Sequence, residues 1–413
     1  MDQLSTAPRQ TRRFHEKREA ILDAAARLFN QKGIKGATLS DVGAEVGLIT
    51  NSVTYYYKKK EDLATACLLR SIAAIEDTAA QAAGAATPEA RVRQFLDLHW
   101  QGLAEVATGA QPELISFNDI RALTPPHSEI AFKAYTEMFR RIRRLLAGDS
   151  RMPLNRSALN ARAHLLLSLA HWARTWLRRY EPEDYARVAG RVADIVLGGL
   201  AAAGGARTDV LPYRLDWPDQ AAEADVTPDA FLRAATFLVN EQGYRGASVD
   251  RISARLKVTK GSFYHHNDNK DDLIAACFEQ TFAVLRRILR EADAAAGSGW
   301  DRLCFAANAL IDYQLSDHGP LLRYTAWSAL PEGVRGDIGR KTDRLTARFA
   351  SLMVDGMADR SIRAVDQTVA AQLVSGMVNA AAELHRWVPG VTRESASDLY
   401  ARPLLLGLFS PPK

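Results

Sequence analysis

The sequence has little of what builds metal centres and covalent cross-links. Only three cysteines occur in 413 residues, Cys67, Cys277 and Cys304, and no CxxC or other metal-ligand spacing joins them. The nine histidines are scattered along the chain. We therefore expect no metal site and no other cofactor, and the sparse cysteines fit a reducing, cytoplasmic setting.

Long apolar runs and enzyme motifs are missing as well. No stretch approaches about 20 uncharged apolar residues, the length that spans a bilayer. The first residues lack the apolar core of a secretory signal. The chain also has no phosphate-binding loop, no GxSxG motif and no paired-carboxylate arrangement. These absences argue against a membrane protein, a secreted protein and an enzyme.

What the chain does have is a helical pattern along most of its length. Hydrophobic residues make up 47% of it, which is enough for full cores. Apolar side chains recur at three- and four-residue spacing, as at Leu165, Leu169, Trp172 and Trp176, and this spacing favours amphipathic helices. Prolines and glycines separate the runs. We predict an all-α fold with two or three domains, because a domain averages roughly 150 residues.

The most informative feature is a segment that occurs twice without a gap. Residues 21–47 match residues 231–257, and the match extends to Cys67 and Cys277. Two cysteines at equivalent positions are better explained as small helix-packing residues than as redox sensors. Both copies have the pattern of a helix-turn-helix, a motif that normally obtains its second reading head through dimerisation. This chain is expected to carry both heads itself.

A break in the helical pattern divides the chain into two similar halves. Residues 204–227 contain two glycines, two prolines and an acidic run, which predicts a linker. Thr227 and Pro228 then supply an N-cap and a first-turn proline for the second copy. Outside the repeat, 371–384 echoes 164–177 more faintly. The expected units are 1–63 (basic arm and first head), 64–203 (first helical body), 204–227 (linker), 228–273 (second head) and 274–413 (second body).

Each copy predicts two helices before the turn of the motif. A glycine that can adopt the left-handed conformation ends the first helix, at Gly33 and at Gly243. Thr38 and Asp41 have capping-box spacing at the start of the second helix, and Ser248 caps the second copy. The local signals of both copies therefore agree with a helix-turn-helix.

The third helix of each copy is the candidate recognition helix. It is expected at 50–57 and at 260–267, with Val53 and Phe263 holding it on the core and the opposite face free for the major groove. Hydroxyls and amides there suit phosphate oxygens, and aromatic faces suit thymine methyls. The candidate DNA contacts are Arg12, Arg13, Thr38, Thr50, Asn51, Ser52, Thr54, Tyr55, Tyr56, Lys60, Ser248, Thr259, Lys260, Gly261, Ser262, Tyr264, His265, His266 and Lys270.

Basic residues near the heads are given specific roles. Arg12 and Arg13 precede the first helix-turn-helix and are expected to form an arm attracted to phosphate or to the minor groove. Lys60 and Lys270 follow the recognition helices and are placed to clamp phosphate. Gly261 would let the backbone approach DNA closely.

Both copies resemble the TetR family of bacterial transcriptional regulators. The segments VTKGSFYHH (258–266) and KDDL (270–273) are very similar to that family's recognition helix and the start of its fourth helix, and LITNSVTYYYKKKEDL (48–63) resembles a variant of it. The resemblance implies three helices for each head and about six for a body with an effector pocket and a dimerising pair. Most members of the family are repressors that a small molecule releases from DNA.

Two positions depart from the family pattern. Asn267 stands where the family has an apolar aromatic residue, the position that Tyr57 fills in the first copy, and it should weaken the fit of the second recognition helix. Ile49 stands where a capping Ser or Thr is usual, as Thr259 provides, so we expect Thr50 to cap the helix one residue later. Both heads are still expected to bind DNA.

The family's dimer interface should close within this single chain. In the family two long helices near the end of the body form a four-helix bundle with a partner, and they correspond here to 157–180 with 183–203 and to 366–388 with 393–409. We therefore expect a monomer that acts as an intramolecular pseudo-dimer, with further self-association on DNA left open. Because the heads differ, the half-sites should differ too and lie about one helical turn apart, roughly 35 Å.

A small-molecule effector is implied by the resemblance, and apolar walls with a few polar groups are typical of ligand cavities. A Trp or His on an apolar helix face can equally be an ordinary core residue. The face that carries Trp172 and Trp176 places the expected working pocket in the first half. The candidate pocket residues are Trp100, Phe117, Asn118, Arg121, Trp172, Trp176, Tyr313, Trp327 and Asn379.

The leading interpretation is thus a cytoplasmic, ligand-responsive repressor that binds an asymmetric double-stranded operator. Two alternatives within DNA binding are a transcriptional activator and a ligand-independent repressor whose bodies are filled. A third is an interaction module with degenerate heads that sequesters another regulator, and Asn267 is its only support in the sequence.

Overall fold

The computed structural model describes residues 12–148, 154–202, 215–217, 228–266, 269–330 and 332–411. Over these residues the fold is all-α, with one isolated antiparallel bridge between Ala201 and Ile362. None of the helices described is both long and apolar enough to cross a membrane. Most of the linker expected at 204–227 lies outside the described residues.

The first half consists of a three-helix head and a helical body. The head is α1 (Arg12–Lys32), α2 (Leu39–Glu45) and α3 (Thr50–Tyr56). The body contains α4 (Lys60–Ala82), α5 (Pro88–Ala107), η1 (Phe117–Ala122), α6 (His127–Leu145), α7 (Arg156–Trp176), η2 (Leu177–Arg179), η3 (Pro182–Asp184) and α8 (Tyr185–Gly198).

The second half repeats this order with a more fragmented end. Its head is α9 (Pro228–Gly246), α10 (Val249–Leu256) and α11 (Lys260–His266), and the chain leaves the helical conformation at Gly243 inside α9. Its body contains α12 (Lys270–Ala294), α13 (Gly299–Leu315), η4 (Tyr324–Ala329), α14 (Glu332–Ala358), α15 (Gln367–Ala381), α16 (Leu384–Trp387), α17 (Arg393–Ala396), η5 (Ser397–Ala401) and α18 (Arg402–Leu405).

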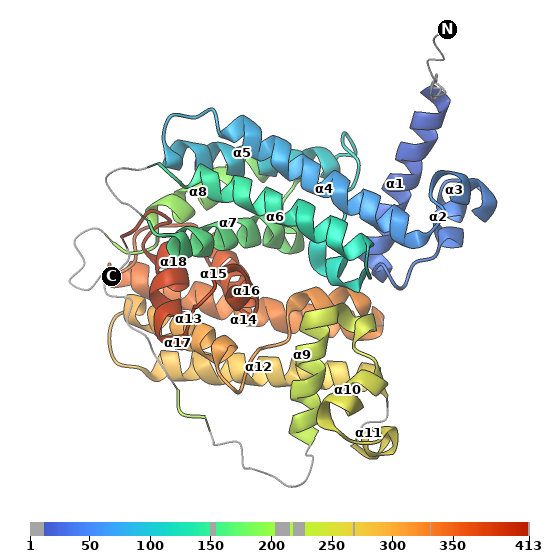
Figure 1. Cartoon of the computed structure of the whole chain (residues 1–413). Helices are drawn as coiled ribbons and strands as arrows, with labels where there is room; N and C mark the ends of the chain where they lie inside the picture. Colours follow the sequence, from blue (N-terminus) through green and yellow to red (C-terminus); the bar gives the residue numbers. More distant parts are fainter. Residues whose placement is uncertain are drawn as a thin grey trace.

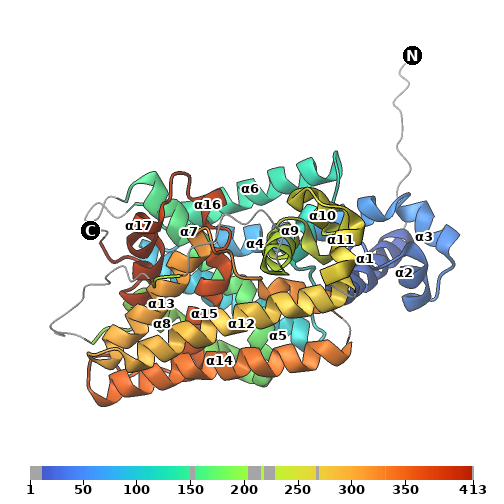
Figure 2. The same cartoon turned by 90° about the horizontal axis from the view of Figure 1, so that it is seen from below.

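The two halves are stacked on each other and their heads lie on the same side of the molecule (Figure 1). The bodies fill the other side, where α7 and α15 run through the middle. In Figure 2, which views the molecule from below, the long helices α12 and α14 run alongside each other along the lower part of the picture. The recognition helices α3 and α11 are at the outer edges of the two heads in Figure 1. This arrangement presents both heads together.

The expected bundle between the halves is present within the chain. Helix α7 packs on α15, and α8 contacts both α15 and α18. Gly376 of α15 lies so close to α7 that an added Cβ would be 2.7 Å from Cδ1 of Trp172. The buried Arg162 guanidinium donates from Nε to the carbonyl of Leu408 at 2.7 Å, and burial lowers its pKa to about 10. The intramolecular pseudo-dimer is therefore confirmed.

The last helix of that bundle is not the long one expected over 393–409. The chain there forms the short helices α17 and α18, joined by a π-helical segment at Ser397–Ala401. Pro403 in the first turn of α18 has no backbone N–H to continue a regular α-helix, which explains the π-helical turn before it. Helical turns thus run from Arg393 to Leu405 and end four residues before the expected 409, whereas the helix expected over 366–388 is interrupted between α15 and α16.

The head–body boundaries expected at 63 and 273 fall inside continuous helices. Helix α4 spans the first boundary and α12 spans the second. The first head has its own hydrophobic cluster, which includes Ile21, Phe29 and Val53. By contrast, Phe231 and Phe263 of the second head belong to the large cluster that fills both bodies. The second head is therefore more tightly integrated with the bodies than the first.

Candidate nucleic-acid interface and cavities

The first head has the local geometry that its sequence predicts. Gly33 adopts a φ of 70° after α1. The Thr38 hydroxyl accepts a hydrogen bond from the Asp41 amide at 3.1 Å, and the Asp41 carboxylate accepts one from the Thr38 amide at 2.9 Å. These bonds from Thr38 lower the pKa of Asp41. The capping box is therefore confirmed. Val42 and Val53 are fully buried, and Val53 fixes α3 on the core.

The opposite face of α3 is open to solvent. Thr50, Asn51 and Tyr55 are exposed, and Tyr55 retains 75% of its accessible surface. Ser52, Thr54 and Tyr56 of the same helix are half-buried. A helix held from behind with hydroxyl, amide and phenol groups in front has the form that base-edge contacts require.

The start of α3 differs from the expectation that Thr50 caps it. Thr50 is the first helical residue, and the N-cap position is occupied by Ile49, which forms no side-chain cap bond. Ile49 is 72% exposed. Since an isoleucine cannot accept a hydrogen bond, the first amides of α3 have no capping partner from that side chain.

Arg12 and Arg13 belong to the first turn of α1 and not to an arm that precedes the helix. No proline or glycine interrupts the chain between Arg12 and Ile21, so the helix extends further toward its N-terminus than expected. The ring of Phe14 on this extension packs on Tyr56 of α3 with centroids 4.8 Å apart. Both arginines are exposed beside the recognition helix.

The second head has the same construction and a different face. Ser248 caps α10 by accepting from the Arg251 amide, as expected. Phe263 is fully buried and its ring lies 5.8 Å from that of Phe231. Tyr264 is 58% exposed.

The remaining contacts proposed for this head lie around the start of α11. Thr259, Lys260 and Gly261 are exposed, and Lys260 forms an ion pair with Asp250 at 2.6 Å. Asn267 and the side chains of Ser262, His265 and His266 lie outside the described part of the structure.

The two lysines assigned to phosphate have partners inside the heads. Lys60 donates from Nζ to the carbonyls of Lys35 and Ala37, at 3.2 and 3.0 Å. Lys270 donates to the carbonyl of Tyr244 and lies over its ring, 4.1 Å from the centroid. Each lysine thus holds the segment at the end of the first helix of its head against the start of the helix on which the lysine lies. This is a structural role that the repeat alone did not reveal.

Two of the expected pocket residues line one cavity, which we call the body cavity. It has a volume of about 70 Å³ and lies among α12, α13, α14 and α15. The side-chain oxygen Oδ1 of Asn379 accepts a hydrogen bond from the Tyr324 backbone amide at 2.8 Å. Trp172 reaches the cavity from the first half, and its buried Nε1 has no hydrogen-bond partner among the described residues. Its walls are otherwise mainly apolar, with Phe278, Phe282 and Phe349.

Several other expected pocket residues are packing groups that line neither cavity described here. Trp100 and Trp176 are almost completely buried in the core. Phe117 packs edge-on against Tyr135 with centroids 5.2 Å apart. Tyr313 packs on Trp217 of the linker at 4.8 Å, and burial raises its pKa to about 12.

The last three expected pocket residues have distinct positions. Trp327 donates from Nε1 to the Arg335 carbonyl at 2.7 Å. Arg121 forms an ion pair with Glu383 of the second half at 2.6 Å, so it joins the two halves. The side chain of Asn118 lies outside the described residues.

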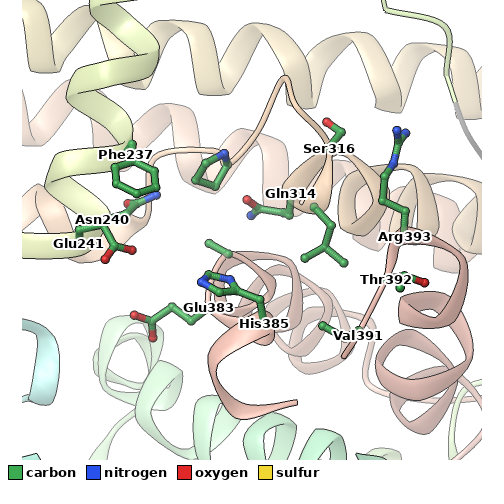
Figure 3. Close-up of a pocket in the computed structure, with 13 residues that line it drawn as sticks. Phe237, Asn240, Glu241, Gln314, Ser316, Glu383, His385, Val391, Thr392 and Arg393 are labelled. Carbon is green, nitrogen blue, oxygen red and sulfur yellow. The ribbon is translucent and has the colours of Figure 1, made fainter. Parts of the chain in front are cut away.

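A larger cavity was not anticipated from the sequence. It measures about 240 Å³ and lies where α9 meets the second body, and we call it the junction cavity (Figure 3). Phe237 and Glu241 come from the second head, whereas Gln314, His385 and Arg393 come from the body. These residues are far apart in the sequence and share no motif. Only the folded chain brings them together. Within the residues described, no group of three or more His, Cys, Asp or Glu side chains could hold a metal.

Comparison with known protein families agrees with this architecture. Residues 21–67 and 231–277 both match the family model described as bacterial regulatory proteins, tetR family. Residues 296–398 match the model of a tetracyclin repressor-like C-terminal domain. Each head and the second body are thus matched separately.

Curated relatives are similar over parts of the chain. The transposon Tn10 TetC protein of Escherichia coli is 26% identical over 157 residues, which is 36% of this chain and 75% of that protein. The transcriptional regulator AcuR of Cereibacter sphaeroides is 35% identical over 75 residues, 18% of this chain and 34% of AcuR. The match therefore spans about a third of the length of AcuR.

Solved structures cover less than half of this chain. PfmR from Thermus thermophilus, a TetR family transcriptional regulator, is 20% identical with a TM-score of 0.35, over 43% of this chain and 94% of PfmR. AibR in complex with isovaleryl coenzyme A and operator DNA is 20% identical with a TM-score of 0.36, over 42% of this chain and 96% of AibR. With its two matched heads, a matched C-terminal domain and a bundle that closes between its own halves, the chain is a tandem member of the TetR family of DNA-binding transcriptional regulators.

Proposed function

We propose that this chain is a ligand-responsive repressor whose two unlike heads bind the two unlike halves of an asymmetric operator. The observation that carries the proposal is the difference between the exposed faces of two equally well-anchored recognition helices. Tyr55 stands out from α3 beside Thr50 and Asn51, whereas Tyr264 stands out from α11 beside Lys260 and Gly261. Different donor and acceptor groups favour different base pairs.

The roles of the individual contacts follow from their positions. Thr50, Ser52 and Thr54 present hydroxyls along the face of α3, and Arg12 and Arg13 on the extended α1 supply charge for phosphate. In the second head Lys260 serves phosphate once it exchanges its partner Asp250. The lysines at 60 and 270 support the reading face from within the heads.

The body cavity supports control by a small molecule. Its walls are mostly aromatic and aliphatic, which suits an apolar ligand with few polar groups. Because Trp172 comes from the first half and the other walls come from the second, a ligand there would contact both halves at once. Binding could then shift one half relative to the other and change the spacing of the heads. The cavity lies in the second body, whereas the sequence favoured a pocket in the first.

The operator tests the proposal. Footprinting of the chain on the DNA upstream of its own gene, followed by selection from a random library, should yield a site without palindromic symmetry. Tyr55→Ala should weaken binding about tenfold by damaging only one half-site, and Tyr264→Ala should do the same at the other. Val354→Ala is a matched control, since Val354 is exposed on α14 in the body. Strong preference for a perfect palindrome would contradict asymmetric reading.

A further inference from the structure

The body cavity has walls without charge. None of the described residues that line it is an Asp, Glu, Lys, Arg or His. Tyr324 on this wall keeps a neutral phenol, because burial raises its pKa to about 12. Asp343 and Arg179, whose charges also act on this phenol, pair with each other at the surface. A charged ligand would lose its hydration without meeting an opposite charge on the wall, so the cavity favours an uncharged molecule.

Trp172 brings an unused hydrogen-bond donor to the same wall. It is 7% exposed, and its buried Nε1 has no partner among the described residues. An indole N–H can only donate, so a ligand oxygen that accepts from it would satisfy this group. The rings of Phe278, Phe282 and Phe349 supply aromatic contacts for the rest of the ligand. These walls suit an aromatic ketone, ester or ether.

The cavity is too small for an aromatic ring unless one wall moves. Its volume is about 70 Å³. An apolar cavity that holds benzene measures about 150 Å³. Four walls are the helices α12, α13, α14 and α15, which pack on one another. Another wall contains Leu321, Leu322 and Tyr324, in a non-helical stretch that leads into η4. We call residues 321–329 the coupling segment, and we expect it to yield because no long helix holds it.

Four successive backbone amides of the coupling segment donate to side chains. Three of the acceptors line the cavity: Leu321 donates to Gln314 at 2.9 Å, Leu322 to Thr281 at 3.0 Å and Tyr324 to Asn379 at 2.8 Å. The Arg323 amide lies between them and donates at 3.0 Å to Oδ1 of Asn240, on α9 of the second head. The cavity wall and the second head thus hold the same four residues.

The coupling segment also reaches the first half. Its helix η4 contacts α1 of the first head as well as α9 of the second. The side chain of Arg323 pairs with Glu383 at 2.8 Å, and the same carboxylate pairs with Arg121 of the first body at 2.6 Å. A displacement of this segment would therefore be felt by both heads and by the first body.

The equivalent segment of the first half lacks these ties to a cavity wall. Asn30 holds the Ser116 amide as Asn240 holds that of Arg323. The counterpart of Thr281 is Ser71, whose buried Oγ has no partner among the described residues. The counterpart of Asn379 is Trp172, which has no oxygen to accept an amide. The connection between cavity and head is thus a property of the second half.

We propose that the body cavity binds one uncharged aromatic molecule with a hydrogen-bond acceptor, and that the coupling segment transmits this binding to the second head through Asn240. A ring that enters pushes the segment away from the oxygens of the cavity wall, and the Arg323 amide then moves against Asn240. Because η4 also contacts α1, one ligand serves both heads. The consequence for repression rests on the proposed function, whereas binding and transmission are properties of the chain without DNA.

Titration of the full chain without DNA tests the ligand class with three probes of similar size. Acetophenone is uncharged and carries a carbonyl acceptor, benzoate is an anion and benzylamine is a cation. The indole N–H signal of Trp172, assigned by its loss in Trp172→Phe, should shift saturably with acetophenone. Benzoate and benzylamine should bind at least about tenfold more weakly. An unchanged signal with acetophenone, or equal binding of a charged probe, overturns the proposal.

Two matched variants locate the binding. Thr342→Phe fills the body cavity, and Val391→Phe fills the junction cavity in the same manner. Thr342→Phe should weaken acetophenone at least about tenfold, whereas Val391→Phe should leave its affinity within about twofold. The reverse pattern places the probe in the junction cavity and overturns the proposal.

Amide hydrogen exchange of the full chain without DNA measures the transmission. Saturating acetophenone should speed exchange at least about threefold in the coupling segment and at the end of α9, residues 240–246. In Asn240→Ala the increase in the coupling segment should remain and the increase in α9 should disappear. Asn30→Ala, the equivalent change in the first half, should keep both increases. No increase in α9 of the unmodified chain, or the same increase in Asn240→Ala, overturns the proposal.

Operator binding is measured separately, so the two failures are distinguishable. A chain that binds acetophenone and transmits the change to α9, and yet stays on its operator, contradicts ligand-responsive repression but leaves the site and its coupling in place. A chain that leaves the operator without a change in α9 contradicts the coupling and agrees with the proposed function.

Discussion

At the level of single residues, one hydrogen-bonded clamp occurs at equivalent positions in both halves. Asn30 donates to the Leu114 carbonyl at 3.0 Å and accepts from the Ser116 amide at 2.8 Å. Asn240 in the second half donates to the Leu321 carbonyl at 2.9 Å and accepts from the Arg323 amide at 3.0 Å. Each asparagine thus fixes its head to the segment before the 3₁₀ helix of its own body. Alignment of the repeat pairs these residues but does not show what they bind.

Replacement of this clamp should destabilise the protein measurably. Asn240→Ala removes two hydrogen bonds and leaves an amide and a carbonyl without their partner, so we expect the free energy of unfolding to fall by about 1–3 kcal/mol. Urea denaturation measures it. Asn51→Ala is the matched control on an exposed helix face and should change stability by less than about 0.5 kcal/mol. Equal effects of the two variants would contradict the role of the clamp.

A buried histidine gives the interface between the halves a pH dependence. His164 is 6% exposed and its Nε2 lies 3.1 Å from the Ala380 carbonyl of the other half. Burial lowers its pKa to about 4, whereas an unfolded histidine titrates near pH 6.5. Between those values the unfolded chain binds a proton that the folded chain does not, so stability falls as the pH falls.

His164→Gln should therefore make the protein less sensitive to acid. The wild-type free energy of unfolding should decline from about pH 6.5 to about pH 4, and the variant should decline less steeply by roughly 1.4 kcal/mol per pH unit. Denaturation at pH 7, 6, 5 and 4.5 provides the comparison. Parallel pH profiles of the two proteins would show that His164 takes up its proton equally in both states.

At the level of helices, the sequence predicted which helices form and in what order better than it predicted the residues at which they begin and end. The capping box at Thr38 and the glycine at Gly33 are local signals and both were confirmed. The beginning of α3 depends on the isoleucine at its N-cap, which no capping rule favours. The extra length of α1 is accompanied by the contact between Phe14 and Tyr56, a pairing across the fold that periodicity cannot show. Tertiary packing decides such ends.

The crossing of α7 and α15 depends on one position without a side chain. An added Cβ at Gly376 would meet the buried Trp172 ring at 2.7 Å, and that ring has little room to move. Gly376→Ala should lower the melting temperature, with a cost of about 1–3 kcal/mol from overpacking. Gly190→Ala on α8 is the control, because a Cβ there meets nothing within 4 Å and alanine favours the helix. Calorimetry should show a lower melting temperature for Gly376→Ala and a slightly higher one for Gly190→Ala.

At the level of the whole molecule, the dimer interface of this family has become intramolecular. The Leu200 amide donates to Leu405 and the Leu408 amide donates to Val196, so backbone bonds join the halves. A complex held by such contacts within one chain does not dissociate on dilution.

DNA binding should accordingly show the behaviour of a monomer. We expect one chain per operator, a Hill coefficient of 1 and an unfolding midpoint that does not change with protein concentration. Sedimentation at nanomolar to micromolar concentrations and titration of labelled operator DNA would measure this. A midpoint that rises with concentration would reveal a second chain in the folded unit.

The heads were predictable from the sequence and the cavities were not. Recognition helices follow from local motifs, and Val53 and Phe263 were buried as expected. The junction cavity is formed by groups such as Phe237, Gln314 and His385, which become neighbours only when three separate segments pack together. Trp176 was expected on a pocket face with Trp172, and Trp100 was expected among the pocket residues, but Trp100 and Trp176 are core residues.

The contact of Glu383 with Arg121 and Arg323 has a consequence for how such a protein can evolve. In a homodimer every substitution appears on both sides of the symmetry axis, so an improvement in one subunit must also be tolerated in its mirror position. Here Glu383 occurs once and its counterpart is Trp176, so each side changes alone. When both halves belong to one chain, a single substitution changes one side of the interface only, so one half can acquire a new property while the other keeps the old one.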